Sequence, residues 1–189
     1  MTKNELRNLY KQKRLGISSK EKLKLDDLLL LQLQTFNFDG IKTLLTFWPI
    51  SNMAEPDTHI YSNYLRHVVE GLKIAYPVSD FASNSMWAKL IDQDTIYTTN
   101  SYGITEPKTG QIINPLDIDL IFVPLLACDK QGFRVGYGKG FYDRFLNQCK
   151  EDVVLMGFSY FEPVDLITNT KEFDIPLNFC ITPIEVYGF

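Results

Sequence analysis

Apolar residues near the start of the chain recur at the spacing of a helix. Leu6 and Tyr10 fall on one side when successive residues turn by roughly 100°, and Thr2 with Glu5 has the spacing of a capping box. The pattern predicts a first helix over residues 3–14. A neighbouring face of this helix carries basic residues, which we expect to form a stripe beside the buried face: Lys3, Arg7, Lys11 and Arg14.

A second pair with capping-box spacing, Ser18 and Glu21, precedes a leucine-rich run. We expect this run to form a second helix that ends near Phe36. A compact apolar stretch over residues 43–47 follows, and Trp48-Pro49 closes it, which is typical of a buried strand that leads into a loop. Two helices are therefore predicted before the first strand.

The next segments alternate between helix and strand patterns. Asp57 can cap a helix that stops at Gly71, and a short strand over residues 73–78 follows it. Residues 120–126 are almost entirely apolar and predict the most deeply buried strand. Because a crossover helix is the usual way to join parallel neighbours, this order favours a parallel sheet.

The middle of the chain has a weaker pattern. Residues 81–99 alternate in part and predict a small antiparallel excursion, whereas residues 102–107 have the composition of a loop. No repeat or linker interrupts the sequence. We therefore expect one α/β domain over residues 1–189, a layered fold with a mainly parallel central sheet flanked by helices.

The amino-acid composition and charge exclude several kinds of protein. The 189 residues are 45% hydrophobic and 22% charged, as in ordinary globular domains, and no apolar stretch approaches the roughly 20 residues that span a bilayer. The charged start of the chain does not resemble a signal peptide, so we expect no membrane partner and a cytoplasmic location. The net charge of −4 argues against a nucleic-acid partner. Three cysteines without a Cys-x-x-Cys pair are interpreted as buried thiols: Cys128, Cys149 and Cys180.

The richest chemistry lies between Asp129 and Arg144, where glycines and cations follow the predicted strand. Glycines let backbone N–H groups approach an anion, and Arg134 and Lys139 would add charged contacts. A Walker A loop is absent, because Gly140 follows Lys139 where that motif needs Ser or Thr. The segment therefore predicts either a phosphate-binding loop or a glycine-rich turn with solvated lysines.

This segment closely resembles the signature of the 5-formyltetrahydrofolate cyclo-ligase family. The resemblance extends along the whole chain in the order of the family: Lys3-x-x-Leu6-Arg7, Glu55-Pro56-Asp57-Thr58, residues 102–107, Val123-Pro124, Asp129, Gly132, Arg134, residues 136–143 and residues 172–177. Several positions depart from the common pattern: Leu125 stands in place of Gly, Cys128 in place of Phe and Asn178 in place of Asp, and residues 78–80 lack a common basic residue.

The resemblance implies ATP- and Mg²⁺-dependent closure of 5-formyltetrahydrofolate to 5,10-methenyltetrahydrofolate, with release of ADP and phosphate. The reaction would pass through a phosphorylated formyl group, an imidate. The implied catalytic residues are Lys139, Arg134 and Tyr142. The implied ATP-binding residues are Lys3, Asn4, Glu5, Leu6, Arg7, Arg134, Val135, Gly136, Tyr137, Gly138, Lys139, Gly140, Phe141 and Tyr142.

The same resemblance assigns the metal and the folate. Asp143 and Asp174 match positions near Mg²⁺, although an exposed helix-capping Asp is the alternative for each. Glu55 matches a carboxylate that contacts the folate and can accept hydrogen bonds from a pterin. Ile50 would form an apolar wall, and Tyr142 would stack on the pterin or support the formyl group, unless it belongs to the core.

Two other kinds of protein stay open. One is a nucleotide- or folate-binding protein on the same fold without turnover, and the other is an RNA-binding module that uses the basic helix. A monomer with small-molecule substrates, ATP and a reduced folate, is the favoured interpretation. The two histidines, His59 and His67, match no motif of the family, and we expect them to be structural or surface groups.

Overall fold

The computed structural model describes residues 1–189, apart from the side chain of Ser51. The four helices are α1 (Lys3–Leu15), α2 (Ser19–Leu33), α3 (Thr58–Val68) and α4 (Phe141–Leu146). The twelve strands are β1 (Thr43–Leu45), β2 (Lys73–Asp80), β3 (Ser85–Leu90), β4 (Tyr97–Thr99), β5 (Thr105–Pro107), β6 (Ile112–Ile113), β7 (Leu120–Val123), β8 (Ala127–Cys128), β9 (Arg134–Val135), β10 (Val154–Phe158), β11 (Phe179–Ile181) and β12 (Val186–Gly188). Short 3₁₀ turns cover Ser51–Met53 and Pro115–Asp117.

The two N-terminal helices begin where their caps predict. The Thr2 side chain accepts a hydrogen bond from the amide of Glu5, and the Glu5 side chain accepts one from the amide of Thr2, so α1 has a complete capping box. Ser18 caps α2 through the amide of Glu21. The second helix ends at Leu33, before the predicted end near Phe36. The prediction of two helices before the first strand is confirmed.

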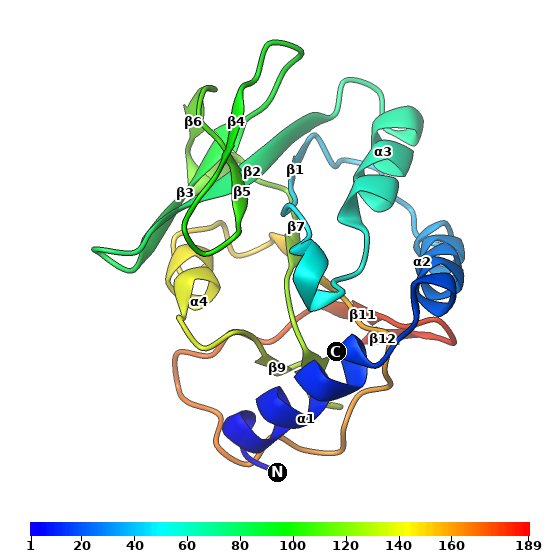
Figure 1. The fold of residues 1–189 in the computed structure, drawn as a ribbon. Coiled ribbons are helices and arrows are strands. Elements are labelled where there is room, and N and C mark those ends of the chain that lie inside the picture. The colour runs from blue at the N-terminus through cyan, green and yellow to red at the C-terminus, as the bar shows by residue number, and fades with distance from the viewer.

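Eight strands form one sheet in the order β12-β11-β10-β7-β1-β2-β3-β6 (Figure 1). The five central strands, from β11 to β2, are parallel to their neighbours, and β12, β3 and β6 add antiparallel edges. The predicted α/β fold with a mainly parallel sheet is therefore confirmed. The antiparallel excursion expected within residues 81–99 is β3, which returns along β2.

Helices cover both faces of this sheet, with α2 and α3 on one side and α4 on the other (Figure 1). Successive strand residues point to opposite faces, so Leu44 packs with α2 and α3 whereas Leu45 packs in the cluster of α4. A third cluster joins Leu6 and Tyr10 of α1 to Val135 of β9. The first helix is thereby fixed against the glycine-rich segment rather than against the main sheet.

The order of the strands places the loop after β1 next to the loop after β7. From β1 the chain continues through α3 to β2 on one side, while β7 is followed by β10 and β11 on the other side. The strand order thus reverses between β1 and β7, and ligands of open α/β sheets bind beyond the carboxyl ends of strands at such a point. The loop that contains Glu55 follows β1, and the glycine-rich segment follows β7.

Several predicted boundaries are wrong. The strand predicted over residues 43–47 ends at Leu45, and the helix expected to stop at Gly71 ends at Val68. Residues 105–107 were expected in a loop but form β5, which pairs with β4 in a separate hairpin. The strand predicted over 73–78 extends to Asp80, because β3 supplies it with a partner along that length. The strand predicted over 120–126 ends at Val123, because Pro124 has no amide hydrogen for the ladder.

Two of the three cysteines are buried. Cys128 and Cys180 are free thiols inside the sheet core, with their Sγ atoms 2.9 Å apart, whereas Cys149 is half-buried. Within the described residues, no helix is long and apolar enough to cross a membrane.

Candidate functional site

The glycine-rich segment packs against the basic face of α1. Arg7 donates from Nε to the carbonyl oxygen of Gly136 at 2.9 Å. Gly138 has a φ of +93°, and a Cβ there would lie 3.3 Å from the Arg7 guanidinium carbon. A residue with a side chain would be strained by this backbone and would displace Arg7. Glycine is thus required where the predicted phosphate loop meets the first helix.

Arg134 lies at the base of this loop. Its guanidinium donates to Asp143 Oδ1 at 2.8 Å and to the carbonyl oxygen of Ile175 at 2.5 Å. Burial lowers the pKa of Arg134, while the charges of Asp143 and Asp174 oppose that change. The structure therefore holds one buried cation between the two carboxylates that the sequence assigns to the metal.

Asp174 also pairs with the N-terminal helix, because Lys3 Nζ lies 2.5 Å from its Oδ2. No group of three metal-ligating side chains forms among the described residues. Mg²⁺ usually takes only one or two protein carboxylates and completes its shell with water and phosphate oxygens. Asp143 and Asp174 fit that pattern, because each presents a partly exposed carboxylate beside Arg134.

Lys139 occupies the exposed tip of the loop. Its carbonyl oxygen accepts a hydrogen bond from Arg144 Nη2 at 2.6 Å, and Arg144 also donates to the carbonyl oxygen of Asn84 at 2.6 Å. Arg144 therefore links the backbone at Lys139 to the turn between β2 and β3. The ammonium group of Lys139 forms no ion pair within the part of the chain that the structure describes.

Glu55 is the buried acid at the opposite end of the site. The amide of Ile50 donates to Oε2 at 2.7 Å, and the hydroxyl of Tyr137 donates to Oε1. Burial raises the pKa of Glu55, and these two hydrogen bonds together with the charge of Arg14 act in the opposite direction. The structure thus brings the predicted folate residues Ile50 and Glu55 into direct contact, and it joins them to the glycine-rich loop.

Tyr142, the first-turn residue of α4, lies between the two ends. Its hydroxyl is buried and has no hydrogen-bond partner among the described residues. Burial raises the pKa of Tyr142, the charge of Glu55 raises it further, and that of Arg134 lowers it. A buried hydroxyl without a partner is costly, by about 1–3 kcal/mol. The position is therefore suited to a ligand that completes the hydrogen bond.

Other predicted contacts are restricted by the fold. The side chains of Leu6 and Val135 lie in the core, so only their backbone atoms can face a nucleotide. Glu5 is occupied in the capping box, and Asn4 accepts a hydrogen bond from Arg7. Phe141 is half-buried and packs edge-on against another aromatic ring. Among the cations predicted to bind ATP, Lys139 is the one with an exposed side chain and no ion pair within the described residues.

One basic residue of α1 lies in a different environment from the predicted one. Arg14 was expected on the exposed basic stripe, but it is 3% exposed and donates to Tyr137 and to the carbonyl oxygen of Leu125. The physical reason is its position on α1, because Leu6, Tyr10 and Arg14 are spaced four residues apart and share the buried face. That spacing was the available signal.

A second buried carboxylate, Asp26, was also missed. Asp26 belongs to α2 and accepts hydrogen bonds from the hydroxyls of Tyr160 at 2.7 Å and Tyr61 at 3.2 Å. Tyr160 also lies 3.3 Å from the Glu55 carbonyl oxygen. These hydrogen bonds connect the loop after β1 to α2 and to the segment after β10.

The histidines are structural or surface groups, as expected, because His59 is half-buried and His67 is exposed. His59 packs edge-on against Trp48 with 4.5 Å between ring centroids.

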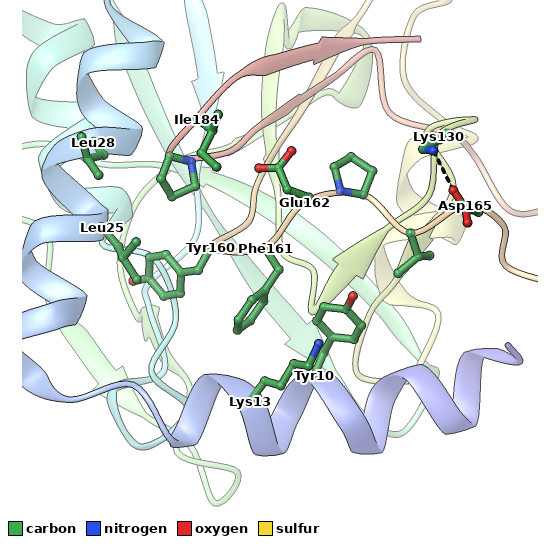
Figure 2. A pocket seen from close by; sticks show the side chains of 13 residues that line it. Tyr10, Lys13, Leu25, Leu28, Lys130, Tyr160, Phe161, Glu162, Asp165 and Ile184 are labelled. Atoms are coloured by element: carbon green, nitrogen blue, oxygen red, sulfur yellow. Dashed lines mark hydrogen bonds and ion pairs between the residues drawn. The ribbon is translucent and has the colours of Figure 1, made fainter.

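A groove lies elsewhere on the molecule. The groove has a volume of about 770 Å³ and lies between α1, α2 and the segment after β10, and Figure 2 shows the side chains that line it. Lys13 lies over the ring of Tyr10, 4.7 Å from its centroid, and Phe161 and Ile184 also line the groove. It contains none of the residues predicted for ATP, folate or metal. The candidate site described above lies instead where α1, the Glu55 loop, the glycine-rich segment and α4 meet.

Known proteins resemble this chain over most of its length. The family model described as the 5-formyltetrahydrofolate cyclo-ligase family matches residues 1–182. The 5-formyltetrahydrofolate cyclo-ligase of Mycoplasma genitalium is 30% identical over 183 residues, which are 94% of this chain and 97% of the relative.

Two solved structures have the same fold. The 5,10-methenyltetrahydrofolate synthetase of Aquifex aeolicus matches with a TM-score of 0.82 and 27% identity, over 100% of this chain and 93% of that one. The synthetase of Mycoplasma pneumoniae matches with a TM-score of 0.74 and 27% identity, over 96% and 98% of the two chains. The motifs, the fold and these comparisons agree, and the chain belongs to the 5-formyltetrahydrofolate cyclo-ligase family.

Proposed function

We propose that the protein converts 5-formyltetrahydrofolate to 5,10-methenyltetrahydrofolate and hydrolyses ATP to ADP and phosphate in the process. Family membership supports the cyclisation. The observation that carries the site assignment is the buried hydroxyl of Tyr142, which lacks a partner among the described residues and feels the charges of both Glu55 and Arg134. A ligand at this hydroxyl would have an acid on one side and a cation on the other.

The proposed chemistry explains why such a site needs both charges. The formyl oxygen is a poor leaving group, so the γ-phosphoryl group is transferred to it and ADP leaves. The N10 lone pair then attacks the formyl carbon, the carbon–oxygen bond breaks with release of phosphate, and N10 loses its proton. Because both nitrogens belong to one folate, orientation supplies much of the rate.

Each end of the site has a distinct part in this scheme. Lys139 and Arg7 would bind phosphate oxygens, and Arg134 would stabilise the charge that develops during transfer. Glu55 would accept hydrogen bonds from the amino and ring N–H groups of the pterin, beside the apolar side chain of Ile50.

The metal site in this proposal consists of Asp143 and Asp174. When it is bound, Mg²⁺ would neutralise part of the negative charge on the phosphate oxygens. The two carboxylates would hold it directly or through water, and Lys3, which pairs with Asp174 at 2.5 Å, would then turn toward a phosphate. We further propose that the chain works as a single-domain cytoplasmic monomer on small molecules.

The test is the formation of 5,10-methenyltetrahydrofolate, followed by its near-ultraviolet absorbance, with ATP and Mg²⁺ present or omitted. Lys139→Ala should lower turnover about 100-fold. Its side chain is exposed, so the fold should persist. Lys130→Ala is the matched control, because Lys130 belongs to the same segment but pairs with Asp165 at 2.6 Å, away from the proposed site.

Loss of product in Lys139→Ala with normal turnover in Lys130→Ala would support the proposal. Binding of ATP or folate without any product in the unaltered protein would instead favour the alternative, a binding protein without turnover.

A further inference from the structure

Arg14 is a buried cation that the proposed reaction does not use. Its Nη1 donates to the carbonyl oxygen of Leu125 at 3.0 Å, and its Nη2 donates to the hydroxyl oxygen of Tyr137. Burial of a charge is costly unless hydrogen bonds compensate it. Within the described residues, Nε of Arg14 has no partner. The burial of Arg14 therefore costs free energy, and its side-chain partner is Tyr137 of the glycine-rich loop.

Tyr137 connects Arg14 to Glu55 through its hydroxyl group. Its hydroxyl accepts from Arg14 and donates to Oε1 of Glu55, while the amide of Ile50 donates to Oε2. A hydroxyl that accepts from a cation becomes a stronger donor, because hydrogen bonds in a chain polarise one another. Three segments that are distant in sequence thus form one chain of hydrogen bonds that ends on a single carboxylate.

The other polar groups near Glu55 do not replace Arg14. Lys22 of α2 is paired with Asp26 at 2.7 Å, so its charge is already balanced. Tyr160, after β10, lies near the backbone carbonyl of Glu55 and not near its carboxylate. Tyr142 of α4 is a neutral hydroxyl whose pKa burial raises. Arg14 is the cation that reaches the Glu55 carboxylate through a hydrogen-bonded path.

We propose that Arg14 is a positioning residue that holds Glu55 as an oriented carboxylate through Tyr137. Burial raises the pKa of Glu55, and the Tyr137 hydroxyl and the Arg14 charge counteract that effect. Without Arg14, Glu55 takes up a proton at higher pH and loses acceptor capacity toward N–H donors. The consequence for folate recognition rests on the proposed function, whereas the effect on Glu55 itself does not.

The direct test is the titration of the Glu55 side-chain carboxyl carbon by ¹³C NMR, with the signal assigned through its loss in Glu55→Gln. Arg14→Met keeps the length of the side chain and removes its charge, and the Glu55 titration should shift to higher pH. Arg14→Lys keeps the charge and should shift it less. Tyr137→Phe breaks the path and should also shift it upward, and the double variant should add little to the larger single effect.

The functional readout is the pH profile of kcat/KM for the reduced folate, which reports groups of the free enzyme. In Arg14→Met the acid limb should move to higher pH, with about a tenfold loss of kcat/KM at about pH 5 relative to the unaltered protein. Arg14→Lys should recover part of this loss. A merely structural role would lower kcat/KM equally at all pH values.

An unchanged Glu55 titration in folded Arg14→Met would overturn the proposal. If Arg14→Met does not fold, Tyr137→Phe decides, because it retains Arg14, and an unchanged Glu55 titration there would refute the path. If the titration shifts but the unaltered protein makes no methenyltetrahydrofolate, the role of Arg14 stands and the proposed function fails.

Discussion

Gly157 in the central strand β10 has no room for a side chain. A Cβ at this position would lie 2.3 Å from Leu125 Cδ2 and 2.8 Å from Leu177 Cδ1. Both leucines are buried in the same core cluster, so neither can rotate into empty space. Replacing Gly157 with Ala therefore forces overpacking between the sheet and the loop after β7.

The expected change in stability is a balance of two effects. Overpacking costs about 1–3 kcal/mol, and the lost flexibility of the unfolded chain returns about 0.4–1 kcal/mol. Gly157→Ala should thus lower the free energy of unfolding by about 1.5 kcal/mol. For a domain of this size, that change lowers Tm by about 3–6 °C.

The assay is thermal and urea unfolding, followed by circular dichroism. Gly188→Ala is the matched control, because Gly188 also lies in a strand but its added Cβ would come only to 3.5 Å from Phe179. Leu125→Ala should cost less in the Gly157→Ala background than alone, with a coupling of about 1 kcal/mol, because it relieves the clash. Equal stability of Gly157→Ala and Gly188→Ala, or strictly additive effects with Leu125→Ala, would refute this reasoning.

Three further predictions concern the site and its surroundings. Burial lowers the pKa of His59 below 6.5, so the unfolded chain binds the proton first and the free energy of unfolding falls as pH drops below about 6.5. The variant His59→Gln should therefore lose less stability than the unaltered protein between about pH 7 and pH 5 in urea titrations, with His67→Gln as the control. Gly138→Ala strains the backbone by about 1–2 kcal/mol and displaces Arg7, and we expect KM for ATP to rise about tenfold in initial-rate measurements. Tyr142→Phe removes an unpaired buried hydroxyl, so Tm should stay constant or rise while turnover falls; a lower Tm would show that the hydroxyl is satisfied in solution.

The parts of the fold that depend on local chemistry were predictable. The caps at Thr2 and Ser18 mark the starts of two helices, and the apolar runs mark β1 and β7. The β4–β5 hairpin was missed because its strands are short and are stabilised mainly by pairing with each other, which periodicity does not reveal.

The candidate site was predictable as a set of residues but not as an arrangement. The glycine-rich motif and Glu55 were identified, yet 82 positions separate Tyr137 from Glu55, and no spacing rule connects them. The burial of Arg14 was not anticipated, because an arginine on an amphipathic helix is usually solvated and its burial depends on acceptors from other segments.

The first helix is attached to the last quarter of the chain. Lys3 pairs with Asp174, the amide of Lys3 donates to Asn169 at 2.6 Å, and the amide of Thr168 donates to the carbonyl oxygen of Met1 at 3.0 Å. During synthesis on the ribosome, α1 emerges before residues 168–174 and cannot reach its final place until they have also emerged. A nascent chain can therefore have β1, β2, β7 and β10 paired while α1 still lacks its contacts with residues 168–174, so the site is completed only after that segment has emerged.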